Sequence, residues 1–326
     1  MRLNRREFLS LVSLSGLGAG FLHNRTLAQS SQLDNPTDPA WTSPLDPPLL
    51  RFVAVGDVGT GEQAQYDVAH SMLRFHQRQP FPFAFLTGDN IYDGGDIQRI
   101  DQVFEQPYQG LLQHKVQFHA ILGNHDVMSN QGQDQIRYPG FNMQGRYYTF
   151  AHGPVQFFAL DTNPGHHWSA QLPWFKRELA QSNADWKIVL GHHPLYASGL
   201  HSIKQRLAKQ LGPLLGQSKA YPGLADQLTP LFTQYGVQLY INGHEHHYER
   251  THAIAGTTYL TCGVGARLRP TGSSTWTAFA SSQLGFAVID IYADQLIIKG
   301  IGVNGIPFDQ GNVLRQAHLD SNSPLL

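Results

Sequence analysis

Five short apolar runs in this 326-residue chain end in the same way, with a glycine followed at once by Asp, Asn or His. Each run is of the kind expected for a buried strand. The five junctions are Gly56-Asp57, Gly88-Asp89, Gly123-Asn124, Gly191-His192 and Gly243-His244. In open α/β sheets, the loops beyond the carboxyl ends of the strands converge on one ligand site, and glycine allows the sharp turns that this requires. The pattern predicts an α/β fold with a polar site where these loops meet.

The periodicity of apolar residues predicts strands and helices that alternate along the chain. Strands are expected over residues 51–55, 83–86, 116–122, 146–150, 155–160, 186–190 and 238–241. Further strands of a second sheet are expected near 257–262, 286–291 and 295–301. Helices are expected over 62–79, 170–182 and 224–235. The segment 271–282 is rich in Ser and Thr and is expected to be a loop.

The composition is that of a chain with a sizeable core and no general affinity for polyanions. Hydrophobic residues make up 41% of the sequence and charged residues 14%. Lys and Arg number 23 against 24 Asp and Glu, so we expect no nucleic acid partner on electrostatic grounds. Cys262 is the sole cysteine, which excludes an internal disulfide and leaves nitrogen and oxygen ligands for any metal site. The 17 histidines suit such a site.

The N-terminal segment has the features of a targeting signal rather than of a part of the folded domain. Arg5 and Arg6 precede a modest apolar stretch that runs to about Leu22, and small residues allow cleavage after Ala28. This arrangement looks like a twin-arginine export signal, with an ordinary secretory signal or a retained anchor as alternatives. The stretch is too short and too interrupted by Gly and Ser for a stable membrane span.

These features divide the chain into three parts. We expect a signal peptide over residues 1–28, a linker rich in Pro, Asp and Ser over 29–49, and a catalytic domain over 50–326. We therefore expect the protein to be exported through the twin-arginine pathway, to the periplasm or outside the cell, and we expect no membrane span in its mature form.

The junctions and the residues just after them contain side chains suited to metal ions. The candidate ligands are Asp57, Asp89, Tyr92, Asn124, His192, His244 and His246. Two carboxylates, a phenol, an amide and three imidazoles are too many for one ion, but two ions can share them if one carboxylate bridges. Two metals about 3.5–4 Å apart can clamp both the attacking and the leaving oxygen of phosphoryl transfer. The absence of thiolates argues against a structural zinc site.

These residues also carry a resemblance to a known family. The blocks are Gly56-Asp57, Gly88-Asp89-Asn90-Ile91-Tyr92, Gly123-Asn124-His125-Asp126, Gly191-His192-His193-Pro194 and Gly243-His244-Glu245-His246. They resemble the signature blocks of calcineurin-like metallophosphoesterases, and the chain is most similar to the small purple (tartrate-resistant) acid phosphatases. The resemblance spans residues 51 to about 303. It implies a four-layer α/β/β/α sandwich with two central mixed sheets and a dinuclear centre at one edge of them.

The resemblance also implies which residues bind each metal. One ion takes Asp57, Asp89, Tyr92 and His246, and the other takes Asp89, Asn124, His192 and His244, so that Asp89 bridges. The position of Tyr92, three residues after Asp89, matches the purple phosphatases. A phenolate suits ferric iron, so the expected pair is Fe(III) with Fe(II), Zn(II) or Mn(II). The alternative for Tyr92 is a loop tyrosine near the site.

The implied activity is that of an acid phosphatase, in which a metal-bound hydroxide attacks the phosphorus of a small phosphomonoester. His125 is the expected proton donor to the leaving oxygen. His201, nine residues after His192, is expected either to bind substrate or share the acid role, or to lie on the surface. Asp161 and Asn163 follow a strand and are expected to hydrogen-bond the metal ligands.

Other functions stay open at this point. A phosphodiesterase or nucleotidase on the same scaffold would use similar metals. A non-catalytic, exported metal- or phosphate-binding protein is a further alternative, against which the presence of His125 beside the full ligand set counts. A nuclease would favour a basic groove, for which the neutral net charge gives no support. Arg267 and Arg269 contact either a phosphate or solvent, and the sequence identifies neither the natural substrate nor the oligomeric state.

Overall fold

The computed structural model describes residues 46–165, 168–199 and 223–315. The expected signal peptide, most of the expected linker, and the candidate residue His201 lie outside the described residues. The described residues all belong to one compact unit. In the described ranges, no helix has the length and apolar character needed to cross a membrane.

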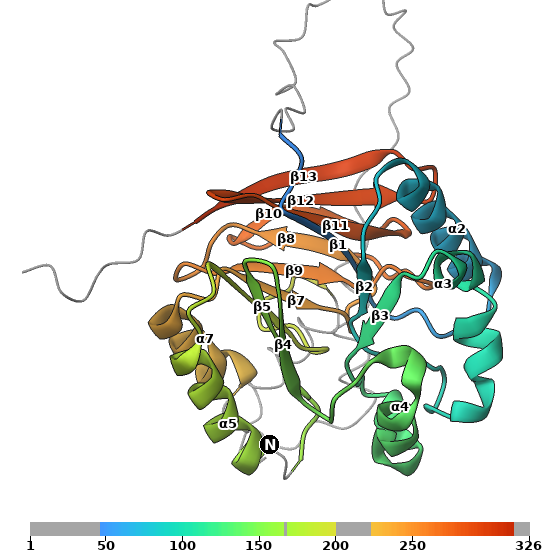
Figure 1. The fold of residues 1–326 in the computed structure, drawn as a ribbon, viewed down its shortest axis with the longest axis horizontal. Coiled ribbons are helices and arrows are strands. Elements are labelled where there is room, and N and C mark those ends of the chain that lie inside the picture. The colour runs from blue at the N-terminus through green and yellow to red at the C-terminus, as the bar shows by residue number, and fades with distance from the viewer. Residues whose placement is uncertain (1–45, 166–167, 200–222, 316–326) are drawn as a thin grey trace, which may run out of the picture. The chain divides into compact units, whose positions relative to one another are not determined.

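A mixed sheet of six strands forms one half of the centre of this unit (Figure 1). Its strand order is β13-β12-β11-β1-β2-β3. The bounds are β1 (Leu50–Val55), β2 (Phe83–Leu86), β3 (Gln117–Ala120), β11 (Gly285–Ile291), β12 (Gln295–Gly302) and β13 (Pro307–Leu314). Strands β1, β2 and β3 run parallel to one another, and β11 pairs with β1 in the antiparallel sense.

A second mixed sheet, of seven strands, has the order β10-β8-β9-β7-β6-β5-β4. The bounds are β4 (Tyr148–His152), β5 (Val155–Ala159), β6 (Trp186–Leu190), β7 (Leu239–Asn242), β8 (Tyr248–Thr251), β9 (Thr258–Cys262) and β10 (Thr277–Ser281). Strands β5, β6, β7 and β9 are parallel neighbours. Their carboxyl ends therefore lie along one edge of the sheet.

Helices cover the outer face of each sheet (Figure 1). On the six-stranded sheet these are α2 (Gln63–Arg78) and α3 (Gln109–Gln113), and α4 (Gln133–Arg137) follows further along the chain. On the seven-stranded sheet they are α5 (Trp168–Gln181) and α7 (Leu224–Tyr235). Short 3₁₀ and π turns complete the connections; they span Ile97–Arg99, Asp101–Glu105, Asp126–Met128, Asn130–Gly132 and Pro139–Phe141.

The alternation of side chains along β1 shows how the layers are held together. Val53 and its neighbours on that face pack against Val68 and Met72 of α2. Phe52 points to the other face, where its ring meets Phe157 of β5 edge-on with ring centroids 5.2 Å apart. A third apolar layer lies between α5, α7 and the outer face of the seven-stranded sheet. The expected four-layer α/β/β/α sandwich with two mixed sheets is therefore confirmed.

The structure differs from the predicted strands in two respects. The three late strands do not share one sheet, because β9 lies beside β7 in one sheet whereas β11 lies beside β1, and β12 beside β11, in the other. The Ser/Thr-rich segment contains strand β10, whose residues are all half-buried and pair with β8. Apolar periodicity identifies a strand but not its partner, and a half-buried edge strand has no continuous apolar run to detect.

The sequence also did not reveal β8 and β13, which belong to different sheets. Arg250 of β8 forms a two-pronged ion pair with Asp309 of β13, with distances of 2.7 Å and 2.8 Å. Tyr248 donates to the same carboxylate over 2.8 Å. This contact ties the two sheets together at one side of the sandwich.

Candidate metal centre

The five glycine junctions meet at one edge of the sandwich. Three of them follow β1, β2 and β3 of one sheet, and two follow β6 and β7 of the other. Because the carboxyl ends of parallel strands point the same way, the junctions of each sheet lie at the same edge of it. The amide of Asp57 donates to the carbonyl of Gly88 over 3.0 Å. At Gly88, where φ is +90°, an added Cβ would lie 2.4 Å from Nδ1 of His192. Glycine is thus required where the loops come closest.

The first group of donors surrounds a phenol oxygen, and we call Asp57, Asp89, Tyr92 and His246 the Tyr92 cluster. The Tyr92 hydroxyl lies 3.1 Å from Oδ1 of Asp57 and 3.0 Å from Oδ2 of Asp89. It lies 3.2 Å from Nε2 of His246, which is itself 3.3 Å from Oδ1 of Asp57. All four residues are buried. Each of them therefore directs a metal-binding atom toward a common point.

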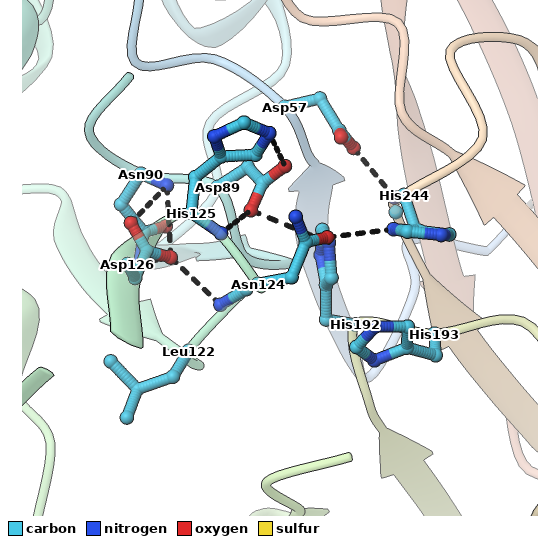
Figure 2. Close-up of polar contacts among 12 residues, drawn as sticks. Asp57, Asp89, Asn90, Leu122, Asn124, His125, Asp126, His192, His193 and His244 are labelled. Carbon is cyan, nitrogen blue, oxygen red and sulfur yellow. Dashed lines mark hydrogen bonds and ion pairs between the residues drawn. The ribbon is translucent and has the colours of Figure 1, made fainter. Parts of the chain in front are cut away.

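The second group surrounds an amide oxygen, and we call Asp89, Asn124, His192 and His244 the Asn124 cluster. Oδ1 of Asn124 lies 3.1 Å from Nε2 of His192 and 2.8 Å from Nδ1 of His244 (Figure 2). Nε2 of His192 is also 3.4 Å from Oδ1 of Asp89. Nδ1 of His192 lies 2.9 Å from the carbonyl of Thr87, so it carries the proton and leaves Nε2 free to bind a metal.

The electrostatics of these groups suit bound cations. Burial would raise the pKa of Asp57, but the hydrogen bond from His246 and the charges of the neighbouring imidazoles outweigh it and lower that pKa to about 2. Burial would lower the pKa of His192, but the carboxylates of Asp89 and Asp57 outweigh it and raise that pKa. Burial and the same two carboxylates raise the pKa of Tyr92. Ionised carboxylates buried this close together need positive charge between them.

The donor atoms of the two clusters lie close enough together to bind metal ions. One ligand atom from each of Asp57, Asp89 and His192 lies within 4.8 Å of the other two, and all three residues are buried. Asp89 belongs to both clusters, with Oδ2 facing the Tyr92 cluster and Oδ1 facing the Asn124 cluster. Oxygen and imidazole donors without thiolate suit hard and borderline cations. The residues of the two clusters therefore have the donor chemistry to hold two metal ions, and Asp89 lies within reach of both clusters.

Asp126 supports both clusters, although the sequence analysis gave it no role. Its buried carboxylate accepts hydrogen bonds from the backbone amides of Gly123 over 2.7 Å, Asn90 over 2.9 Å and Ile91 over 3.1 Å. Nε2 of Gln135 donates to it as well, over 3.0 Å. Burial and the charge of nearby Asp89 outweigh these hydrogen bonds and raise its pKa to about 6. Asp126 thus fixes two ligand-bearing loops to each other. The sequence feature that could have pointed to this role is the position of Asp126 directly after His125, the candidate proton donor.

His125 lies at the boundary between the Tyr92 cluster and solvent. Its ring packs edge-on against Tyr92 with centroids 4.7 Å apart, and its side chain is 32% exposed. Nδ1 lies 2.5 Å from the carbonyl of Asp93, which can only accept, so Nδ1 carries a proton. Nε2 faces Asp89, 4.0 Å from Oδ2. The ring is therefore held with one nitrogen fixed and the other directed into the site.

Asp161 and Asn163 support the backbone rather than the metal-binding atoms, which corrects the expectation that they hydrogen-bond the ligands. Nδ2 of Asn163 donates to the carbonyls of Leu122 and Gly123 over 3.3 Å each. Oδ2 of Asp161 forms a buried ion pair with Nη1 of Arg146 over 2.8 Å. The Asn163 contacts hold the segment that precedes Asn124, and Oδ1 of Asp161 orients Asn163 by accepting from its Nδ2 over 2.8 Å. The sequence placed these residues near the site, but their partners depend on packing.

His193 lies beside the Asn124 cluster, with its Nδ1 occupied by a hydrogen bond to Thr162. Its Nδ1 lies 2.9 Å from the hydroxyl of Thr162, which also accepts the His193 amide over 2.9 Å. Its ring lies against that of His244, with centroids 4.6 Å apart (Figure 2). His193 thus packs against a candidate metal ligand.

Comparison with known proteins agrees with this geometry. Residues 50–248 match the model of the family described as calcineurin-like phosphoesterase. Purple acid phosphatase 7 of Arabidopsis thaliana is 30% identical over 249 residues, which cover 67% of this chain and 70% of that protein. Tartrate-resistant acid phosphatase type 5 of Homo sapiens is 28% identical over 306 residues, which cover 79% of this chain and 89% of that protein.

Solved structures show the same fold. Purple acid phosphatase PPD1 from yellow lupin aligns with a TM-score of 0.68 at 20% identity, covering 82% of this chain and 54% of that one. GAP50, the anchor in the inner membrane complex of Plasmodium, aligns with a TM-score of 0.67 at 21% identity, covering 82% and 89%. These two neighbours have different roles, so the structural likeness establishes the fold alone. With more than half of its length matched by the family model, the chain belongs to the calcineurin-like phosphoesterase family.

Proposed function

We propose that this chain is an acid phosphatase that hydrolyses small phosphomonoesters with the help of two metal ions. The observation that carries the proposal is the pair of buried donor clusters that share Asp89, with a tyrosine in one of them and a histidine at its edge. The relatives named purple and tartrate-resistant acid phosphatases support it.

The Tyr92 cluster would hold Fe(III), because a phenolate is a hard anionic ligand. The Asn124 cluster would hold a divalent ion, either Fe, Zn or Mn. When bound, such a pair supplies an activated water molecule and positive charge for the phosphate oxygens. The carbonyl of Thr87 fixes the tautomer of His192, and the amides bound by Asp126 fix the loops, so the donor atoms are arranged before any ion binds.

His125 would donate a proton to the leaving oxygen. The carbonyl of Asp93 holds Nδ1, so ring rotation is restricted and Nε2 faces the clusters. Because the side chain is partly exposed, solvent can return the proton after each turnover. His201 is proposed as a second group that binds substrate or shares the acid role.

Export through the twin-arginine pathway, to the periplasm or outside the cell, is also proposed, from the Arg5-Arg6 pair and the apolar stretch after it. That pathway carries folded proteins and would suit a metal-loaded enzyme. Replacing both arginines with lysine should retain the protein in the cytoplasm, which fractionation and immunoblotting would measure. Unchanged export would point to an ordinary secretory signal.

The function is tested by comparing 4-nitrophenyl phosphate with bis(4-nitrophenyl) phosphate as substrates for the native-metal protein. We expect kcat/KM to be larger for the monoester by at least about tenfold, which corresponds to a difference of about 1.4 kcal/mol in barrier height. A preference for the diester would favour the phosphodiesterase alternative. Metal-loaded protein that binds phosphate and hydrolyses neither ester would favour a binding protein on this fold.

A further inference from the structure

The loop formed by residues 263–269, which follows β9, lies directly against the Tyr92 cluster. The amide of Gly265 donates to the carbonyl of Gly56 over 3.1 Å, and the amide of Arg269 donates to the carbonyl of His246 over 2.8 Å. A Cβ added to Gly265 would lie 2.6 Å from the Gly56 carbonyl oxygen. The backbone of the 263–269 loop therefore follows the wall of the Tyr92 cluster, with no room for a side chain at Gly265.

The side chain of Arg267 leaves this loop over the ring of Tyr92. Its Cζ atom lies 4.9 Å from the ring centroid, within the range of an attractive cation–π contact. Arg267 also contacts the carboxylates of Glu62 over 3.4 Å and Asp93 over 3.3 Å. Those two side chains are 61% and 80% exposed, so the ion pairs are weak and serve mainly to orient the guanidinium.

The position of the Arg267 guanidinium is important because two carboxylates lie beside the phenol oxygen of Tyr92. Oδ1 of Asp57 and Oδ2 of Asp89 lie 3.1 Å and 3.0 Å from it, so the oxygen sits beside two negative charges. These charges raise the energy of the electrons on a phenolate at Tyr92. A guanidinium on the ring face has the opposite effect, and its attraction grows as the ring becomes more electron-rich.

We propose that Arg267 is a positioning residue for Tyr92, holding the plane of its ring and lowering the energy of its phenolate electrons through a cation–π contact. The inference rests on the proposed binding of Fe(III) by Tyr92. It predicts that Arg267 sets the energy at which the tyrosinate transfers charge to the iron, which is visible as the position of an absorption band. Arg269 provides a matched control, because it lies two residues further along the loop and its side chain is exposed.

The experiment compares absorption spectra of the iron-loaded full chain in four forms, namely wild type, Arg267→Gln, Arg267→Lys and Arg269→Gln. Loss of the positive charge in Arg267→Gln raises the donor orbital, so its visible band should move to longer wavelength by on the order of 10 nm. Arg267→Lys keeps the charge without the planar group and should shift less. Arg269→Gln should absorb like the wild type. Resonance Raman spectra would verify that tyrosinate remains the ligand.

Three results would overturn the proposal in distinguishable ways. A folded Arg267→Gln variant with the wild-type band position would show that Arg267 does not act on Tyr92. An unmoved band together with a KM raised about tenfold would assign Arg267 to the substrate instead. A wild-type protein that contains iron but has no visible band would remove the iron–tyrosinate assignment itself, and the inference with it. Circular dichroism and the Arg267→Lys variant separate these outcomes from loss of folding.

Discussion

The amide of His244 donates to Oδ2 of Asp57 over 2.8 Å, which joins the loop after β7 in one sheet to the loop after β1 in the other (Figure 2). The second oxygen of the same carboxylate, Oδ1, faces the hydroxyl of Tyr92 and Nε2 of His246. One carboxylate therefore both aligns the two sheets and contributes a donor atom. This dual use leads to the first prediction.

Replacing Asp57 with Asn should remove one metal while leaving the fold intact. The amide can still accept the His244 hydrogen bond, but it lacks the negative charge that a cation requires. We expect metal content to fall from about two ions per chain to about one. Phosphatase activity should fall by at least about 100-fold. Inductively coupled plasma mass spectrometry would measure the first effect, with Asp67→Asn on the surface of α2 as the control. Full metal content in Asp57→Asn would show that Asp57 is not needed for metal binding in the Tyr92 cluster.

Replacing Tyr92 with Phe tests the identity of the metal in the same cluster. The change removes the phenol oxygen that lies between Asp57 and Asp89 and keeps the ring that packs against His125. If Fe(III) binds there, the native-metal protein has a visible charge-transfer band and the variant has none. Absorption spectroscopy, with iron analysis on the same samples, would measure the band in both proteins. A colourless wild-type protein that is active with zinc or manganese would exclude the iron–tyrosinate pair.

Replacing Asp126 with Asn should lower both the metal affinity and the stability of the protein without changing a candidate metal ligand. The amide nitrogen would face the donors that Asp126 now accepts from, so at least one buried group loses its partner. We expect a loss of about 2–3 kcal/mol in the free energy of unfolding. Metal affinity should fall by about 10–100-fold. Urea unfolding and competitive chelation would measure both, with Asp134→Asn on α4 as the control. If Asp126→Asn bound metal with wild-type affinity, Asp126 would not have this supporting role.

His119 on β3 should make the protein less stable in acid. Its ring, 8% exposed, stacks on that of Phe150 with centroids 4.4 Å apart. Burial lowers its pKa from 6.5 to about 4, with the charge of His152 acting in the same direction. The unfolded chain therefore takes up a proton first as the pH falls. The stability that this residue contributes is complete above pH 6.5 and is lost as the pH falls from 6.5 to about 4.

The variant His119→Phe should lose this acid sensitivity. Between pH 7 and pH 4.5, its free energy of unfolding should fall by about 2 kcal/mol less than that of the wild type. Urea denaturation followed by fluorescence at both pH values would measure the difference. The exposed His70 of α2, replaced by Gln, should leave the wild-type pH dependence in place. Equal losses in His119→Phe and the wild type would show that another group causes the acid sensitivity.

The sequence predicted the local features well because each depends on neighbouring residues. Helices α2, α5 and α7 lie within two residues of their expected bounds, since an apolar stripe and its ends are visible in a short window. The five glycine junctions were visible for the same reason. The two-sheet sandwich came from the family resemblance and not from periodicity. Periodicity alone grouped β9 with β11 and β12, and it missed β8, β10 and β13.

The sequence by itself determined the chemistry of the donors, because the side chains that can bind a hard cation are a property of residue type. Only the tertiary structure decided how they are held. Asp126 accepts hydrogen bonds from amides of two loops, and Arg267 reaches the ring of Tyr92 from a loop far along the chain. Such partners depend on the pairing of distant strands and on close packing between sheets, which no local pattern of residues encodes.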